Sequence, residues 1–150
     1  MKKILLLLLL SFGLIGSSTS LAEYNSYKLA QAAGGFAIIN DIFEKLTKSE
    51  CGYAINKSYS LNKTLNEIFL YLNNKDREEF IAFLESEKFK NDLAENDSFI
   101  SGTINAGKKD GLDVKTICGM LVTIASMSYQ EAEKQWNYAK QHYSKWRNYS

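Results

Sequence analysis

The sequence of 150 residues has no proline, one histidine and two cysteines, and its basic and acidic side chains nearly balance. No stretch rich in proline, glycine or serine divides the chain, so we expect one domain with a single hydrophobic core. No convincing run of residues alternates with the two-residue period of a strand. These absences argue against a multidomain protein and favour an all-α fold.

Residues 1–22 have the three parts of a cleavable secretory signal peptide, in order. Two lysines follow the initiating methionine, an apolar run covers residues 4–16, and a small-residue motif ends at Ala22. The apolar run is shorter than the roughly 20 residues that a membrane-spanning helix needs, and no cysteine for lipid attachment is nearby. We therefore expect cleavage between Ala22 and Glu23. The mature domain, residues 23–150, is then periplasmic or secreted, without a stable membrane anchor.

The balance of charge also bears on the partners of the mature chain. Cleavage removes two lysines and no acidic residue, so the formal net charge changes from +1 to −1. A nucleic-acid site needs an excess of lysine and arginine on one face. No such excess is present, so we expect no nucleic-acid partner.

The two cysteines, Cys51 and Cys118, predict one disulfide, because an exported protein reaches an oxidising compartment. Closing a loop of this length would stabilise the fold by roughly 4 kcal/mol. The alternative is a redox or metal site, but the cysteines lack the Cys-x-x-Cys spacing and only one histidine accompanies them. We expect a structural disulfide and neither metal nor cofactor.

In the first half of the mature chain, the spacing of apolar residues predicts three helices. Apolar residues recur at steps of three and four over 28–47 and again over 61–72. The glycine pair at 34–35 costs about 1 kcal/mol per residue, so either the helix begins after it or another backbone packs closely there. Asp76 and Glu79 are spaced as the capping pair of the third helix.

The second half predicts two or three more helices. Asp97 is expected to cap a short helix, and residues 107–111 carry the strongest turn signal. Asp113 then caps a helix that is apolar on more than one face, as expected of the central helix of a bundle. Ser128 and Glu131 form a further capping box, which favours a break before the last helix. We therefore expect an all-α, single-domain bundle of five or six helices, stapled by one disulfide.

Catalytic signals are weak. His142 is the only histidine, and no G-x-S-x-G or H-E-x-x-H motif accompanies it. The third helix carries clustered carboxylates that would suit acid–base hydrolysis, but their spacing with basic neighbours is typical of a solvated helix face. These carboxylates are Glu78, Glu79, Glu85 and Glu87. We assign no catalytic residue, and keep a small hydrolase that uses this cluster or His142 as an alternative.

Two groups of residues are candidates for binding a partner. The last helix carries a regular stripe of tryptophan and tyrosine, which favours core packing over an exposed face. Trp146 and Tyr149, near the free end, are the members we expect to be exposed. Lys108, Lys109 and Asp110, in the charged turn, are the other candidates.

These features favour a binding protein over an enzyme, because binding needs a shaped surface whereas catalysis needs convergent reactive groups. In its signal peptide, size, helices and disulfide the chain resembles the immunity proteins that neutralise secreted bacterial toxins, a resemblance of architecture only. It implies a specific protein partner in the periplasm. The alternative is a periplasmic stress chaperone, since the chain is similar in size and helix content to small disulfide-bonded acid chaperones, although no local motif of theirs surrounds either cysteine. The sequence leaves a homodimer open.

Overall fold

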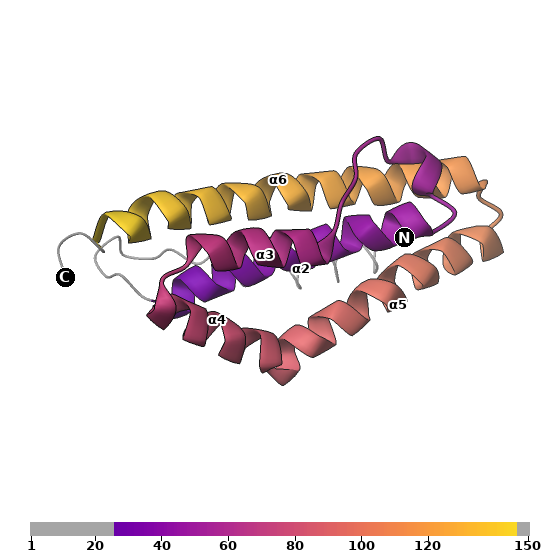
Figure 1. Ribbon diagram of the computed structural model, residues 1–150. Helices are drawn as coiled ribbons and strands as arrows, with labels where there is room; N and C mark the ends of the chain where they lie inside the picture. The colour runs from indigo at the N-terminus through magenta and orange to yellow at the C-terminus, as the bar shows by residue number, and fades with distance from the viewer. Residues whose placement is uncertain (1–25, 147–150) are drawn as a thin grey trace.

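The computed structural model describes residues 26–146, and the side chains of residues 27–142. Within these bounds the chain forms five α-helices and a short 3-10 helix, with no strand. They are α2 (Ser26–Lys48), the 3-10 helix η1 (Gly52–Ala54), α3 (Leu61–Tyr71), α4 (Asn74–Glu85), α5 (Glu87–Lys109) and α6 (Val114–Trp146) (Figure 1). The predicted all-α bundle is confirmed. The expected signal peptide, residues 1–22, lies outside the described residues.

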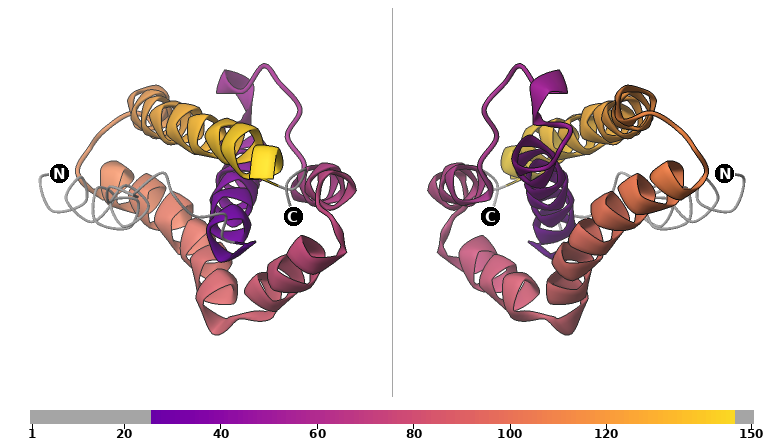
Figure 2. Two further views of the ribbon diagram at one scale, coloured as in Figure 1. Left: turned by 90° about the vertical axis from the view of Figure 1, so that its left-hand side faces the viewer. Right: turned by 90° about the vertical axis from the view of Figure 1, so that its right-hand side faces the viewer.

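The central helix of the bundle is α2, which packs against each of the other four α-helices. In Figure 1, α6 runs beside α2 in the opposite direction, and the end views of Figure 2 show α4 and α5 as a V on another side of α2. The expectation that the helix after Asp113 would be central was wrong. Small buried residues such as Ala33 and Ala37 let neighbouring helices approach α2, whereas α6 leaves Met127 67% exposed.

The glycine pair does not interrupt α2. Gly34 is buried, and a Cβ atom at this position would overlap the ring of Phe83, which α4 places against the α2 backbone. The helix therefore begins before the glycines, and the close neighbour is an aromatic ring rather than a second backbone. Packing of this ring offsets the roughly 1 kcal/mol of helix propensity that a glycine loses relative to alanine.

The start of α4 lies earlier than expected. Asn73 is its N-cap, and the side-chain oxygen of Asn73 accepts a hydrogen bond from the backbone N–H of Asp76 at 2.9 Å. The prediction of Asp76 and Glu79 as a capping pair was wrong, because Asn73 takes the capping position. Asp76 is instead in the first turn, where a carboxylate suits the helix dipole.

A single long helix, α5, replaces the short one that Asp97 was expected to cap. Asp97 lies inside α5, and its carboxylate is 2.8 Å from the ammonium of Lys45 in α2. Lys45 is also 2.9 Å from Asp41, and Asn96 donates a hydrogen bond to the same carboxylate at 2.9 Å. The capping role was wrong because Asn96 and Asp97 bind α2 instead. This polar network joins α5 to α2.

The last helix, α6, is continuous through Ser128 and Glu131, so the predicted break was wrong. The Glu131 side chain accepts a hydrogen bond from Gln135 at 2.8 Å. Ala125 and Trp136, on either side of the expected break, are both buried in the core. Packing on both sides therefore outweighs the local capping signal.

The turn between α5 and α6 is confirmed, but it is shorter than expected. Gly111 has a φ of 79°, a conformation that glycine adopts without the steric cost of a Cβ atom. The Asp113 carboxylate accepts a hydrogen bond from the N–H of Thr116 at 2.9 Å, which confirms it as the cap of α6. Gly107 belongs to α5, and a Cβ atom there would lie 2.7 Å from the side chain of Ile117, so this position favours glycine.

The core consists of two clusters. The disulfide-end cluster is largely aliphatic and joins α2, α5 and α6, whereas the aromatic cluster joins α2, α3, α4, the start of α5 and the second half of α6. The buried members of the disulfide-end cluster are Ile39, Ile42, Phe43, Leu46, Cys51, Ile100, Ile104, Ile117, Cys118, Leu121 and Ala125. Those of the aromatic cluster are Leu29, Ala30, Ala33, Ala37, Ile68, Leu72, Phe80, Phe89, Trp136 and Ala139.

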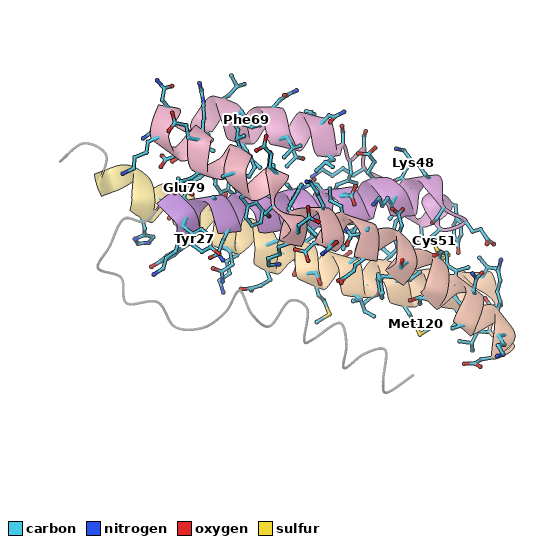
Figure 3. All side chains as sticks on the ribbon, turned by 90° about the horizontal axis from the view of Figure 1, so that it is seen from below. Tyr27, Lys48, Cys51, Phe69, Glu79 and Met120 are labelled. Carbon is cyan, nitrogen blue, oxygen red and sulfur yellow. A yellow bond between two sulfur atoms is a disulfide. The ribbon has the colours of Figure 1, made fainter. Side chains whose placement is uncertain are left out.

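The disulfide between Cys51 and Cys118 is confirmed. Both residues are 0% exposed, and their Cα atoms are 5.2 Å apart across a sequence separation of 67 residues. Figure 3 shows Cys51 at the opposite end of the bundle from Tyr27 and Glu79. Among the described helices, none has both the length and the apolar character that crossing a membrane requires.

Candidate functional site

The disulfide brings two surface segments to the same end of the bundle. One is the loop of residues 49–60, which contains η1, and the other is the turn of residues 110–113 between α5 and α6 (Figure 1). The loop begins with a hydrogen-bonded turn, in which the backbone N–H of Cys51 donates to the Ser49 hydroxyl at 3.1 Å. At Gly52, a Cβ atom would overlap the carbonyl oxygen of Thr47. Hydrogen bonding, a glycine and the disulfide therefore all hold the first half of the loop.

The predicted binding residue Lys108 contacts this loop. Its ammonium lies 2.6 and 2.8 Å from the two carboxylate oxygens of Glu50. An exposed ion pair of this kind stabilises by about 1 kcal/mol or less, so it orients the side chains more than it holds the fold. Lys109 and Asp110 are exposed at the same end. The charged turn and the loop of residues 49–60, which are far apart in the sequence, therefore meet at this end of the bundle.

An exposed aromatic residue lies on the same loop as Glu50. Tyr53, in η1, is 65% exposed. We name Glu50, Tyr53, Lys108, Lys109 and Asp110 the disulfide-end surface. Tyrosine is enriched at binding hot spots because it offers a large contact area with few rotatable bonds. Tyr53 was not among the predicted binding residues, although its position two residues after Cys51 was a usable signal.

The second half of the loop packs an aromatic ring against α6. The ring of Tyr59 stacks on Phe43 of α2 with centroids 4.4 Å apart, and Tyr129 of α6 meets it edge-on at 5.7 Å and 78°. Tyr129 also lies 5.7 Å from Phe36. Tyr59 and Tyr129 are each partly buried, and their nearly perpendicular rings pack against the disulfide-end cluster.

A lysine of the same loop lies over both rings. The Lys57 ammonium is 5.3 Å from the centroid of Tyr59 and 5.6 Å from that of Tyr129, which are cation–π distances. Burial raises the pKa of Tyr59, and the Lys57 charge acts in the opposite direction. Burial also raises the pKa of Tyr129, to which the carboxylates of Glu133 and Glu67 add. The pair of tyrosine rings therefore combines aromatic faces with nearby negative charge.

The candidates for catalysis do not converge. His142 stacks on Tyr138 with ring centroids 4.0 Å apart. The clustered carboxylates are all exposed, and within residues 27–142 no hydrogen bond or ion pair joins one of them to His142. These carboxylates are Glu78, Glu79, Glu85 and Glu87. Over the same residues, no three histidine, cysteine or acidic side chains come together as metal ligands would.

Part of the predicted aromatic stripe of α6 packs in the core. Trp136 is 5% exposed and meets Tyr71 of α3 edge-on at 5.6 Å. The hydroxyl of Tyr71 also donates to the backbone carbonyl of Lys140 at 2.9 Å. Core packing, the favoured interpretation, is thus confirmed at Trp136. Tyr149 and the side chain of Trp146 lie outside the described residues.

A scan against protein-family models and searches of curated proteins and solved structures found no match for this chain. Function must therefore be argued from the chain's own surfaces.

Proposed function

We propose that this chain is an exported, non-enzymatic protein that binds one protein partner through its disulfide-end surface, in the manner of an immunity protein that neutralises a secreted bacterial toxin. The observation that carries this proposal is Tyr53, 65% exposed on a loop whose base is fixed by a buried disulfide. A loop that is ordered before it binds loses less conformational entropy on binding. The charged residues beside Tyr53 would add specificity and speed of association.

The disulfide also supports export. Disulfides persist in oxidising compartments and are rare in the cytosol, and this one is fully buried in the core. A periplasmic or secreted location, with cleavage between Ala22 and Glu23, follows as part of the proposal. It is tested by intact-mass measurement of the protein from a periplasmic fraction, where a chain that begins at Glu23 is expected. A chain that keeps residues 1–22 and stays in the cytosol would contradict it.

The partner is tested by affinity capture with the mature domain from a mixed-strain bacterial culture, followed by reconstitution of the purified pair. We expect one exported toxin to bind with a fixed stoichiometry and to lose its activity in the complex. Tyr53→Ala and Lys108→Glu should each weaken the reconstituted complex at least tenfold in Kd. Leu70→Ala is the matched control, because Leu70 is 81% exposed on α3, away from the disulfide-end surface.

The same material separates this proposal from the chaperone alternative. If the domain forms no stoichiometric complex but protects many unrelated proteins from aggregation in acid, as measured by light scattering, the chaperone function replaces the immunity function. If both assays are negative, binding of a protein partner by this surface is wrong.

A further inference from the structure

The rings of Tyr59, in the second half of the loop, and Tyr129, in α6, have the form of an aromatic cage around the Lys57 ammonium. Tyr59 and Tyr129 come from segments far apart in the sequence, and their rings are nearly perpendicular, at 78°. One face of Tyr59 is covered by Phe43, so the Lys57 ammonium approaches from the opposite face. Two perpendicular π faces around one cation are the arrangement with which proteins bind alkylammonium groups.

Lys57 is held by the rings and not by a carboxylate. Among residues 27–142, the ion pairs do not include Lys57, and its side chain is exposed. A lysine on a flexible four-carbon stem can leave such a position for solvent at a small free-energy cost. Its ammonium therefore serves as an exchangeable occupant of the cage.

The charges around the cage favour a cation. Glu67 of α3 and Glu133 of α6 are near enough to Tyr129 to affect it electrostatically. Within the described part of the chain, neither carboxylate takes part in an ion pair. If Lys57 moved away, the two aromatic faces would be left without a cation, beside two carboxylates that form no ion pair among the described residues.

We propose that the cage formed by Tyr59 and Tyr129 binds an alkylammonium group from outside the chain, and that Lys57 is an internal stand-in that competes with it. The group is a lysine side chain of a partner or a quaternary ammonium such as choline. This inference does not depend on the proposed toxin partner, whose surface is Tyr53 and the charged turn.

The test is a titration of the mature domain with choline, followed by NMR of the tyrosine rings at constant ionic strength. The neutral isostere 3,3-dimethylbutanol is the ligand control, because it has the same shape without the charge. Acetyl-lysine amide, with its free side-chain ammonium, is titrated separately and distinguishes a primary from a quaternary ammonium. We expect one or both cations to shift the Tyr59 and Tyr129 resonances, and the isostere to shift neither.

Variants of the cage decide whether it is the site. Lys57→Ala removes the competitor and should tighten cation binding by about two- to fivefold, the effect of one exposed cation–π contact. Tyr129→Leu should abolish binding, whereas Tyr129→Phe keeps the aromatic face and should retain it. Glu133→Gln should weaken binding, most clearly at low salt. Tyr27→Leu, at the opposite end of the bundle from the disulfide, should change nothing.

Two outcomes would overturn the proposal. One is equal binding of choline and its neutral isostere, which would show apolar binding without cation selectivity. The other is binding of neither cation to Lys57→Ala when its tyrosine spectra are those of a folded protein. Because Tyr129→Phe and Glu133→Gln change no packing volume in the core, they keep the test valid if Tyr129→Leu does not fold.

Discussion

The two ends of the bundle hold their helices together in different ways. The disulfide-end cluster packs mostly aliphatic side chains around a covalent link, and the long loop of residues 49–60 begins at this end, where it leaves α2 for α3. The aromatic cluster has no covalent link, and large rings such as Phe80 and Trp136 pack against small residues such as Ala33 of α2. Its helices α3, α4 and α5 are joined by short connections.

The difference shows where each kind of stabilisation is useful. A long loop loses much conformational entropy on folding, and a disulfide reduces that loss by restricting the unfolded chain. Short connections need no such restriction, so the other end depends on how closely rings and small residues fit. The disulfide end should therefore be sensitive to reduction, and the aromatic end to changes of side-chain volume.

The largest effect should follow loss of the disulfide. The double variant Cys51→Ser, Cys118→Ser should lower the free energy of unfolding by roughly 4 kcal/mol, and Tm by roughly 10–20 °C. Calorimetry measures the loss, and hydrogen exchange locates it. Amides of residues 49–60 and of the first turns of α6 should lose protection before those of α3 and α4. An unchanged Tm, or an equal loss of amide protection at both ends of the bundle, would contradict the proposed difference between the two ends.

The next effect concerns the polar network between the two clusters. Along α5, Asn96 lies between Phe89 of the aromatic cluster and Ile100 of the disulfide-end cluster. Asp41→Ala should destabilise the fold by about 2–3 kcal/mol, because it leaves the buried Asn96 amide and the Lys45 ammonium without their shared acceptor. Urea unfolding at neutral pH measures this loss.

Asp97→Ala is the matched control, because it removes the other carboxylate that contacts Lys45. The Asp97 side chain is 68% exposed, against 9% for Asp41. Removing an exposed partner should cost about 1 kcal/mol or less. Equal losses for the two variants would show that the network does not join the ends through its buried members.

Much of this fold could be predicted from the sequence, and the errors have a common physical origin. The steps of three and four residues predicted the helices, and the expectation of an oxidising compartment predicted the disulfide. The errors at Asp97 and Ser128 arose because a capping signal describes only local hydrogen bonds. In the folded chain, Asp97 binds Lys45 of another helix, and the helix around Ser128 is held by core contacts on both sides.

The candidate site was less predictable for a similar reason. Lys108 was identified as a turn residue, but its contact with Glu50 depends on how the disulfide positions the loop. The cage was missed because Lys57 and Tyr59 are near each other in the sequence whereas Tyr129 is on the last helix. Only the packing of α6 on α2 brings these residues together.

A smaller effect should follow a volume change at the aromatic end. Gly34→Ala places a Cβ atom where the ring of Phe83 lies, so the ring must move. We expect a net loss of about 1–2 kcal/mol, after the gain in helix propensity. Gly119→Ala on α6 is the matched control, since no atom lies within 4 Å of its new Cβ, and it should gain up to about 1 kcal/mol.

A double-mutant cycle sharpens this result. In a Phe83→Leu background, Gly34→Ala should cost less than in the wild type, because the clash with the ring is gone. Thermal melts of the four proteins measure the coupling. Strictly additive losses would mean that the glycine is required for another reason than its contact with Phe83.

The smallest effect concerns the link from α2 to α3. The Glu44 carboxylate accepts hydrogen bonds from the Lys48 ammonium at 2.6 Å and from the backbone N–H of Leu61, at the start of α3, at 2.7 Å. These two contacts lower the pKa of Glu44. Its contribution to stability is therefore complete above about pH 4.5, the ordinary value, and is lost as the pH falls through the lower folded value.

Glu44→Gln should thus cost about 0.5–1 kcal/mol at neutral pH and almost nothing at pH 3, so the wild type and the variant converge in acid. Urea unfolding at both values measures the convergence, and hydrogen exchange at the start of α3 should show the neutral-pH loss locally. Glu95→Gln, an exposed position on α5, should leave both values unchanged. A difference between wild type and Glu44→Gln that stays constant down to pH 3 would mean that the side chain acts through packing and not through its charge. The contact between α2 and α3 at the disulfide end would then stabilise the fold through side-chain packing, as the contacts in the aromatic cluster do.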